Sequence, residues 1–234
     1  MSEWKQKRFW TDVSVEKDED GYSVALDGRR IKTPAKAPLI LPARPMAEAV
    51  ADEWAAQEGE IDPRRMPFTR SANAAIDKVR TQHGEVADLL ADYGDSDLLC
   101  YRADRPQELV ERQAEAWGPA LDWAEQALGV RLEPRSGVIH RPQDPEALAR
   151  LRAQVHALDA FRLAAFHDLV SLTGSLILGF AAARDWRPVD ALWALSRLDE
   201  HWQEEQWGAD DEAAAIEALK RDAFLHAKAF YDFA

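Results

Sequence analysis

Carboxylates gather near the end of the chain in a pattern that could bind cations or a basic protein surface. Residues 198–219 contain eight acidic side chains and neither lysine nor arginine. The acidic residues are Asp199, Glu200, Glu204, Glu205, Asp210, Asp211, Glu212 and Glu217. Trp202 and Trp207 stand among them, and tryptophan combines a large apolar area with a polar N–H. This acidic segment is more typical of a binding surface than of an active site.

A metal site is one alternative for these carboxylates, because His201 directly follows Asp199 and Glu200. Consecutive residues of a helix point about 100° apart, so the three side chains cannot share one face. We therefore expect no metal site there. Asp210 and the acidic residues after it have a simpler explanation, since Asp210 can cap the next helix and acidic residues in a first turn complement the helix dipole.

The helix expected over residues 188–206 separates its acidic residues by face. At 100° per residue, its core stripe consists of Ala191, Leu195, Leu198 and Trp202. Asp199 borders this stripe, whereas Glu200, Glu204 and Trp193 lie on the far side. An exposed tryptophan beside two carboxylates predicts a binding face for the basic residues of a partner.

Signatures of common catalytic sites are missing from the sequence, which has no GxGxxG, P-loop or HExxH motif and no EF-hand loop. Residues 94–98 (GDSDL) come close to the nucleophile motif of one esterase family. However, the chain has no Asp-x-x-His and no GxSxG elbow. We therefore expect Asp95 or Ser96 to cap the segment that follows rather than to take part in catalysis.

Three other features have structural explanations. Residues 172–176 (LTGSL) lie in an apolar stretch, where the glycine and serine would allow close helix packing. His167 is expected in the core as a neutral, hydrogen-bonded side chain. Cys100 is the single cysteine, so it can form no internal disulfide and no cysteine pair exists for zinc. Its apolar neighbours predict a small buried side chain.

Charge and composition narrow the classes of partner. The net charge is −13 and the pI about 4.9, the opposite of a nucleic-acid-binding footprint. A basic or neutral protein partner fits better. The longest uncharged apolar run, between Asp168 and Arg184, is too short to span a bilayer. No apolar segment follows the first residues, so we expect no secretory signal and a cytoplasmic protein.

The spacing of apolar residues changes once along the chain, from a period typical of strands to one typical of helices. Residues 8–42 alternate with period two and contain the hairpin signal Asp27-Gly28, which predicts three or four antiparallel strands. Helical periodicity follows in successive segments. These segments are 45–58, 68–82, 85–93, 106–128 with a kink or break at Gly118-Pro119, 145–158, 161–183, 188–206 and 210–233. We predict an α+β fold with a small β-rich domain (residues 1–43) and a multi-helical domain (residues 44–234).

The order of many short motifs resembles the F1-ATPase assembly chaperone family of mitochondria and α-proteobacteria. The match covers about residues 8–230, and no single motif is specific. The motifs are Arg8-Phe9-Trp10, Gly21-Tyr22, 26–29 (LDGR), 32–34 (KTP), 51–57 (ADEWAAQ), 66–70 (MPFTR), Ala72-Asn73, 96–101 (SDLLCY), Arg112-Gln113, 172–176 (LTGSL), Asp199-Glu200 and Trp207-Gly208. Phe68 and Ser71 depart from the family pattern, at the scale of packing changes.

The resemblance implies a function that composition alone does not. Members of the family have no catalytic activity or cofactor and hold the unassembled F1 α subunit until the β subunit replaces the chaperone. An acidic residue before the Trp-Gly pair is important in the family, and it corresponds to Asp199 or Glu200. Trp54 is the other position carried over. We expect a monomer in the bacterial cytoplasm, or in the mitochondrial matrix if the protein comes from a eukaryote.

Three alternatives remain open at this point. The helix over 188–206 could carry an ordinary solvated charge run in which Arg197 pairs with Glu200. The protein could instead be a small-molecule enzyme whose cations gather in an anion-binding cleft. The candidate cations are Arg29, Lys32, Arg64, Arg65 and Arg70. A generic protein-binding adaptor is the third possibility.

Overall fold

A computed structural model describes residues 7–137 and 140–234, and their contacts divide the chain into two units. The first unit contains the residues up to Gln82, 159–164 and 229–234. The second unit contains 83–158 and 165–228. The boundary expected after residue 43 differs from this division, because α1 (Arg44–Ala55) packs on strands of the first unit and α2 (Pro67–Ala74) packs on α1. The α+β class is confirmed.

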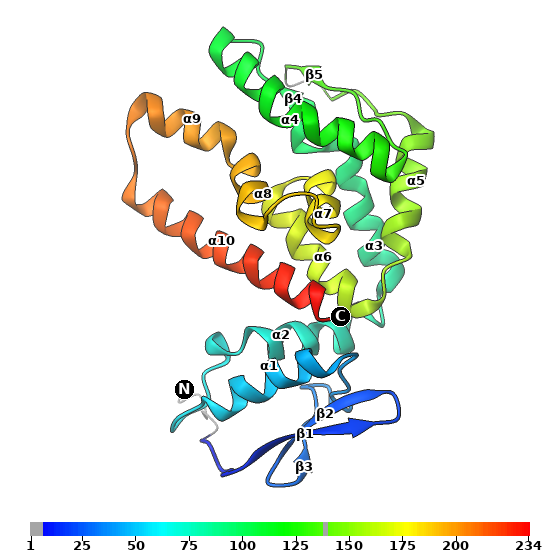
Figure 1. The fold of residues 1–234 in the computed structure, drawn as a ribbon, viewed down its shortest axis with the longest axis vertical. Helices are drawn as coiled ribbons and strands as arrows, with labels where there is room; N and C mark the ends of the chain where they lie inside the picture. Colours follow the sequence, from blue (N-terminus) through cyan, green and yellow to red (C-terminus); the bar gives the residue numbers. More distant parts are fainter. Residues whose placement is uncertain (1–6, 138–139) are drawn as a thin grey trace. The chain divides into compact units, whose positions relative to one another are not determined.

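The first unit is built on a three-stranded antiparallel sheet in the order β1-β2-β3, with α1 packed against its first two strands (Figure 1). The strands are β1 (Val13–Asp18), β2 (Gly21–Leu26) and β3 (Arg29–Arg30). The predicted Asp27-Gly28 hairpin is confirmed, since both residues adopt the positive φ (47° and 75°) that a two-residue turn between twisted strands favours. Leu41 extends the sheet by a bridge to Tyr22.

Aromatic rings join distant segments within the first unit. After α2 the helix widens into a π turn over Ala75–Val79, so the helix predicted for 68–82 is present but not regular. Phe68 lies 5.7 Å from Phe233 and 6.0 Å from Phe230, and Phe230 lies 6.3 Å from Phe161. These ring contacts explain why the chain returns to this unit at 159–164 and 229–234.

The second unit is helical, and its most buried element is α7 (Leu176–Ala183), which contacts α4 and α8 (Figure 1). Its other helices are α3 (His83–Ala91), α4 (Gln107–Leu128), α5 (Pro145–His156), α6 (Ala160–Thr173), α8 (Val189–Ser196), α9 (Leu198–Trp207) and α10 (Asp211–Asp232). The first turn of α6 and the end of α10 belong to the first unit. The first unit also contains the short element η1 (Pro63–Arg65). The short elements of the second unit are η3 (Asp92–Ser96), η4 (Leu98–Cys100) and the parallel pair β4 (Tyr101–Arg102) and β5 (Arg135–Ser136).

The apolar segment predicted as one helix over 161–183 is two helices, and the LTGSL motif forms the corner between them. Gly174 adopts a left-handed conformation (φ 69°), and the Ser175 hydroxyl accepts a hydrogen bond from the backbone N–H of Leu178 at the start of α7. The packing role expected for this motif is therefore wrong. Close packing depends instead on Gly179, where a Cβ atom would lie 2.6 Å from Val170.

Buried Asp97 joins this corner to η4. Its carboxylate accepts hydrogen bonds from the Leu99 N–H (3.0 Å), the Ser175 hydroxyl (2.8 Å) and the Ile177 N–H (3.0 Å). The capping role expected for Asp95 or Ser96 therefore belongs to Asp97. Burial raises the pKa of Asp97 to about 6, against the effect of the hydrogen bonds.

Three further expectations concern single residues. Helix α4 continues through Pro119, so no break occurs there. His167 is exposed rather than in the core, and its hydrogen bond to Asp168 (2.9 Å) raises the pKa of the imidazole. Cys100 is buried as predicted, and desolvation raises the pKa of its thiol. Within the ranges the structure describes, no helix has the length and apolar character needed to cross a bilayer.

Candidate functional site

The helix predicted over 188–206 is interrupted at Arg197, which separates α8 from α9. Arg197 has φ −111° and ψ 14°, so the two helices do not share one regular 100° period. The expected exposure of Trp193 is wrong for this reason: its side chain is 3% exposed and packs on Phe224 with ring centroids 5.5 Å apart. Its indole N–H donates to Glu217 (3.3 Å). Trp193 is therefore part of the core of the second unit.

Trp202 was expected in the core stripe, but it is not fully buried on α9. The side chain is half-buried, and the Arg112 guanidinium lies 5.7 Å from its ring centroid. Arg112 also forms a bidentate ion pair with Glu205 (2.6 and 2.7 Å). The indole of Trp202 is thus held at the surface, where it lines a groove.

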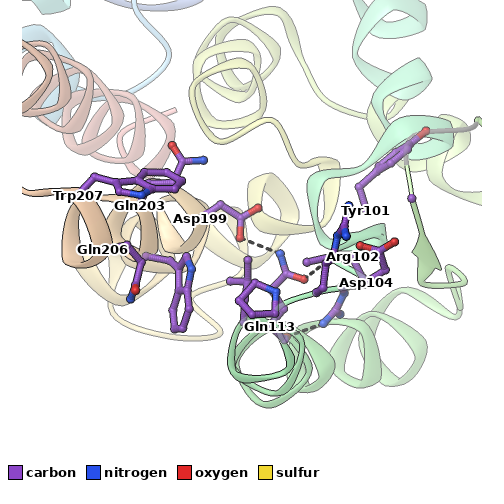
Figure 2. Close-up of a pocket in the computed structure, with 14 residues that line it drawn as sticks. Tyr101, Arg102, Asp104, Gln113, Asp199, Gln203, Gln206 and Trp207 are labelled. Atoms are coloured by element: carbon purple, nitrogen blue, oxygen red, sulfur yellow. Dashed lines mark hydrogen bonds between the residues drawn. The ribbon is translucent and has the colours of Figure 1, made fainter.

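This groove has a volume of about 610 Å³, and all of its lining residues belong to the second unit. One side comes from α9, as Figure 2 shows, and the other from β4, the loop after it and the start of α4. The α9 side contains Asp199, Trp202, Gln203, Gln206 and Trp207. The opposite side contains residues 101–106, Leu109 and Gln113. The groove thus combines apolar, amide and carboxylate groups with the guanidinium groups of Arg102 and Arg105.

A buried glutamine holds Asp199 in place within the groove (Figure 2). Gln113 is 2% exposed; its Nε2 donates to Asp199 Oδ1 at 2.7 Å, and its Oε1 accepts from the Ala103 N–H at 2.8 Å. Both ends of the amide are therefore used, which fixes its orientation. Asp199 is half-buried. Its Oδ1 is hydrogen-bonded to Gln113, and the rest of the carboxylate remains available to a ligand in the groove.

Arg102 carries a positive charge that interacts with Asp199, and its guanidinium is tied to the backbone. The Arg102 guanidinium donates to the carbonyls of Leu99 (2.7 Å) and Gln113 (2.5 Å) and lies 5.1 Å from the ring centroid of Trp117. Desolvation lowers the pKa of Arg102, although the attraction of Asp199 opposes it. Asp199 is thus stabilised by a nearby cation without forming a direct ion pair with it.

The neighbouring acidic residues lie in different environments. Glu200 is exposed and pairs with Arg197 (2.8 Å), as the solvated-charge alternative predicted for that residue. Glu204 is half-buried on α9. His201 hydrogen-bonds to Glu217 (3.1 Å), so Asp199, Glu200 and His201 point to three different neighbours. Accordingly, no cluster of metal-ligating side chains occurs among the residues that the structure describes.

The start of α10 agrees with its sequence interpretation. The Asp210 carboxylate accepts from the Glu212 N–H (2.8 Å) and the Ala213 N–H (3.4 Å), so Asp210 is the predicted cap. Asp211 and Glu212 lie in the first turn. The acidic segment therefore divides into a capping part on α10 and a groove-lining part on α9.

Trp54 lies on α1 in the first unit, not in the groove. Its ring centroid is 5.2 Å from that of Trp10, and its Nε1 is buried without a hydrogen-bond partner among the described residues. The adjacent Glu53 caps α2 from a different helix. Its carboxylate accepts from the Phe68 N–H (2.6 Å), the Thr69 N–H (2.8 Å) and the Thr69 hydroxyl (2.7 Å).

Replacing Glu53 with alanine should lower the free energy of unfolding by about 1–3 kcal/mol, because it leaves the first N–H groups of α2 without their acceptor. The matched control is Glu48→Ala in the same helix, which removes an exposed ion pair with Arg44 and should cost less than about 0.5 kcal/mol. Urea denaturation of both variants measures the difference. Equal losses would show that the Glu53 hydrogen bonds contribute nothing specific.

The cations that could have formed an anion-binding cleft do not line the groove. Arg29, Lys32, Arg64, Arg65 and Arg70 all belong to the first unit, whereas the groove belongs to the second. Arg64 is already paired with Asp62 (2.9 Å). The groove therefore offers no support for the enzyme alternative based on these residues.

The fold and the site define an α+β protein with a groove of indoles, amides and a fixed carboxylate on an acidic helix. The family model described as ATP12 chaperone protein matches residues 7–125, just over half of the chain. The chain therefore belongs to the ATP12 chaperone family, and it is a chaperone of ATP synthase assembly.

Solved and curated relatives agree with this assignment. The chain is 50% identical to Atp12 from Paracoccus denitrificans, with a TM-score of 0.95 and 99% of each chain covered. An aspartate-to-lysine mutant of that protein superposes equally well, with a TM-score of 0.96, 50% identity and 99% of each chain covered. "Protein atp12, mitochondrial" of Schizosaccharomyces pombe is 27% identical over 223 residues, which cover 90% of this chain and 77% of that protein.

Several residues of the groove were not predicted as site residues from the sequence, although Gln113 belongs to one of the family motifs. Gln113 could have been found, since it is a polar residue on the otherwise apolar face of α4 that also carries Trp117 and Leu121. Arg102 and Leu109 carried no local signal. They join the groove only because the chain folds back from η4 toward the start of α4.

Proposed function

We propose that this protein binds the unassembled α subunit of the F1 sector and protects its exposed interface until the β subunit takes its place. Membership of a family of ATP synthase assembly chaperones supports a client among the F1 subunits. The choice of the α subunit follows the resemblance of the sequence to α-binding chaperones. The protein needs no cofactor for this task, because holding a client requires only a complementary surface.

The negative charge of α9 is the observation that supports this helix as the client-binding surface. The helix has four carboxylates (Asp199, Glu200, Glu204 and Glu205) and neither lysine nor arginine. A subunit surface that binds nucleotide phosphates is rich in arginine and lysine, so the carboxylates of α9 complement it. Asp199 and Glu204 are the contacts we favour, because Glu200 and Glu205 already pair with arginines of this chain.

Trp54 has a different part in this proposal. Its contact with Trp10 and its position beside Glu53 on α1 support a role in holding the first unit together rather than a direct contact with the client. We also propose that the protein acts as a monomer. Its compartment would be the cytoplasm of a bacterium or the mitochondrial matrix of a eukaryote, in line with the bacterial and mitochondrial relatives.

Light scattering of the α subunit during refolding tests the proposed function. Wild-type protein at a 1:1 ratio should suppress aggregation of the α subunit, because the bound chaperone covers the apolar interface that drives aggregation. The same addition should leave aggregation of the β subunit unchanged. Equal protection of both subunits would favour a generic adaptor, and protection of neither would contradict a holding role.

A further inference from the structure

We propose that the groove between α9 and the start of α4 is a docking site for a client segment in which a large apolar side chain adjoins a lysine or arginine. This inference rests on the proposed function, and it names the chemistry of the segment that the α subunit would insert. The apolar side chain would lie between the indoles and the aliphatic wall of the groove. The adjoining cation would pair with Asp199.

The apolar part of the groove is open in the free protein. Trp207 is 80% exposed, the most exposed of the large apolar side chains that the structure describes, and it lines the groove with Trp202, Leu109 and Pro106. It is the last residue of α9, and Gly208 turns the chain there with φ 94°. Neither the helix nor the turn therefore requires an indole at this position. An exposed aromatic anchor beside a half-buried one is the arrangement that a client side chain can complete.

The polar part of the groove is prepared for a cation. Gln113 binds Asp199 Oδ1 and holds the carboxylate in one orientation, so binding need not order it. Arg102 donates to two backbone carbonyls, so it is not positioned to neutralise Asp199 by a direct contact. Gln203 and Gln206 line the same groove with amide groups that can hydrogen-bond to the backbone of an extended segment.

The charge around the groove favours a basic segment over a second copy of this chain as its occupant. The net charge is −13, and residues 198–219 lack lysine and arginine altogether. Two such surfaces would repel one another, whereas a segment with an arginine or lysine is attracted. A volume of about 610 Å³ accommodates a large side chain with part of its backbone.

Peptide binding tests this inference with variants of the full chain. The probes are 15-residue peptides tiled along the F1 α subunit, measured by fluorescence anisotropy against wild type, Trp207→Ala and Asp199→Asn. Peptides that bind should contain an apolar residue next to lysine or arginine, and each variant should weaken them at least about tenfold. Changing the basic residue of a bound peptide to glutamine should weaken wild-type binding similarly but have little effect on Asp199→Asn.

The matched control is Leu89→Ala, which removes an exposed apolar side chain (56% exposed) from α3 and should change affinity less than twofold. If wild type captures the whole α subunit but Trp207→Ala and Asp199→Asn capture it equally well, the groove is not the docking site and the proposed function stands. If wild type captures no α subunit, the proposed function fails. Self-association that Trp207→Ala abolishes would overturn the inference in favour of a second copy.

Discussion

Replacing Asp97 with alanine should lower the free energy of unfolding by about 3–5 kcal/mol, as expected when one partner of a buried polar network is removed. The side chain is fully buried, and it accepts hydrogen bonds from Leu99, Ser175 and Ile177. Alanine would leave two backbone N–H groups and a hydroxyl in the core without this acceptor. Urea denaturation at pH 7 measures the effect.

The control for Asp97 is Asp122→Ala on α4, an exposed position where the loss should be less than about 0.5 kcal/mol. The loss of stability for Asp97→Asn should lie between the losses for these two variants. Its amide oxygen can still accept a hydrogen bond, whereas its NH₂ group faces another donor. A loss for Asp97→Ala no larger than that for Asp122→Ala would show that the three hydrogen bonds do not stabilise the corner between α6 and α7.

The raised pKa of Asp97 makes the free energy of unfolding depend on pH. Burial raises the pKa of Asp97 to about 6, so the folded protein binds this proton more tightly than the unfolded chain does. The stability that the protonated carboxyl contributes is fully present below about pH 4 and is lost as pH rises toward 6, by about 3 kcal/mol. Relative to Asp97→Asn, wild type should therefore lose stability between pH 4 and 6. A constant difference across this range would contradict the raised pKa.

Charge reversal at Asp199 is expected to have the largest effect on client binding. In Asp199→Lys, a cation would replace the carboxylate that Gln113 orients and would lie near the charge of Arg102. We expect capture of the α subunit to weaken about 100-fold, or about 3 kcal/mol, because a basic client residue would then meet a like charge. Affinity is measured by titrating immobilised α subunit with folded variant.

Two further variants separate contact from stability at this site. Asp199→Asn keeps an oxygen for Gln113 but removes the charge, so it should stay as stable as wild type and still lose at least tenfold in affinity. Glu200→Lys changes an exposed residue that pairs with Arg197 and should weaken capture less than about threefold. Equal effects of Asp199→Lys and Glu200→Lys would mean that the overall charge of α9, rather than the oriented carboxylate, determines binding.

The sequence predicted the kind and order of most elements, because their signals are local. The Asp27-Gly28 hairpin and the Asp210 cap both depend on residues within a few positions. The breaks at Gly174 and Arg197 were missed for the opposite reason. Both lie in continuous helical patterns, and the corner at Gly174 is held by Asp97, which is far away in the sequence.

The sequence placed only some residues of the candidate site correctly. Asp199 was correctly predicted to border the core. Asp199 and the buried Leu198 both lie on α9, so their relative positions do not depend on the break at Arg197. Trp193 was placed on the wrong side, because it precedes the break and the helical wheel assumed a single period. The opposite wall of the groove comes from residues 101–113, and its approach to α9 depends on tertiary packing that no local period encodes.

Co-purification with individual F1 subunits tests the central claim most directly. Tagged wild-type protein should retain the isolated α subunit at about one copy per chaperone, and it should not retain the β subunit under the same conditions. Adding β subunit to the complex should release the α subunit into an α–β pair. Retention of the β subunit in place of α, or of neither subunit, would contradict the proposal that this protein holds the α subunit for assembly.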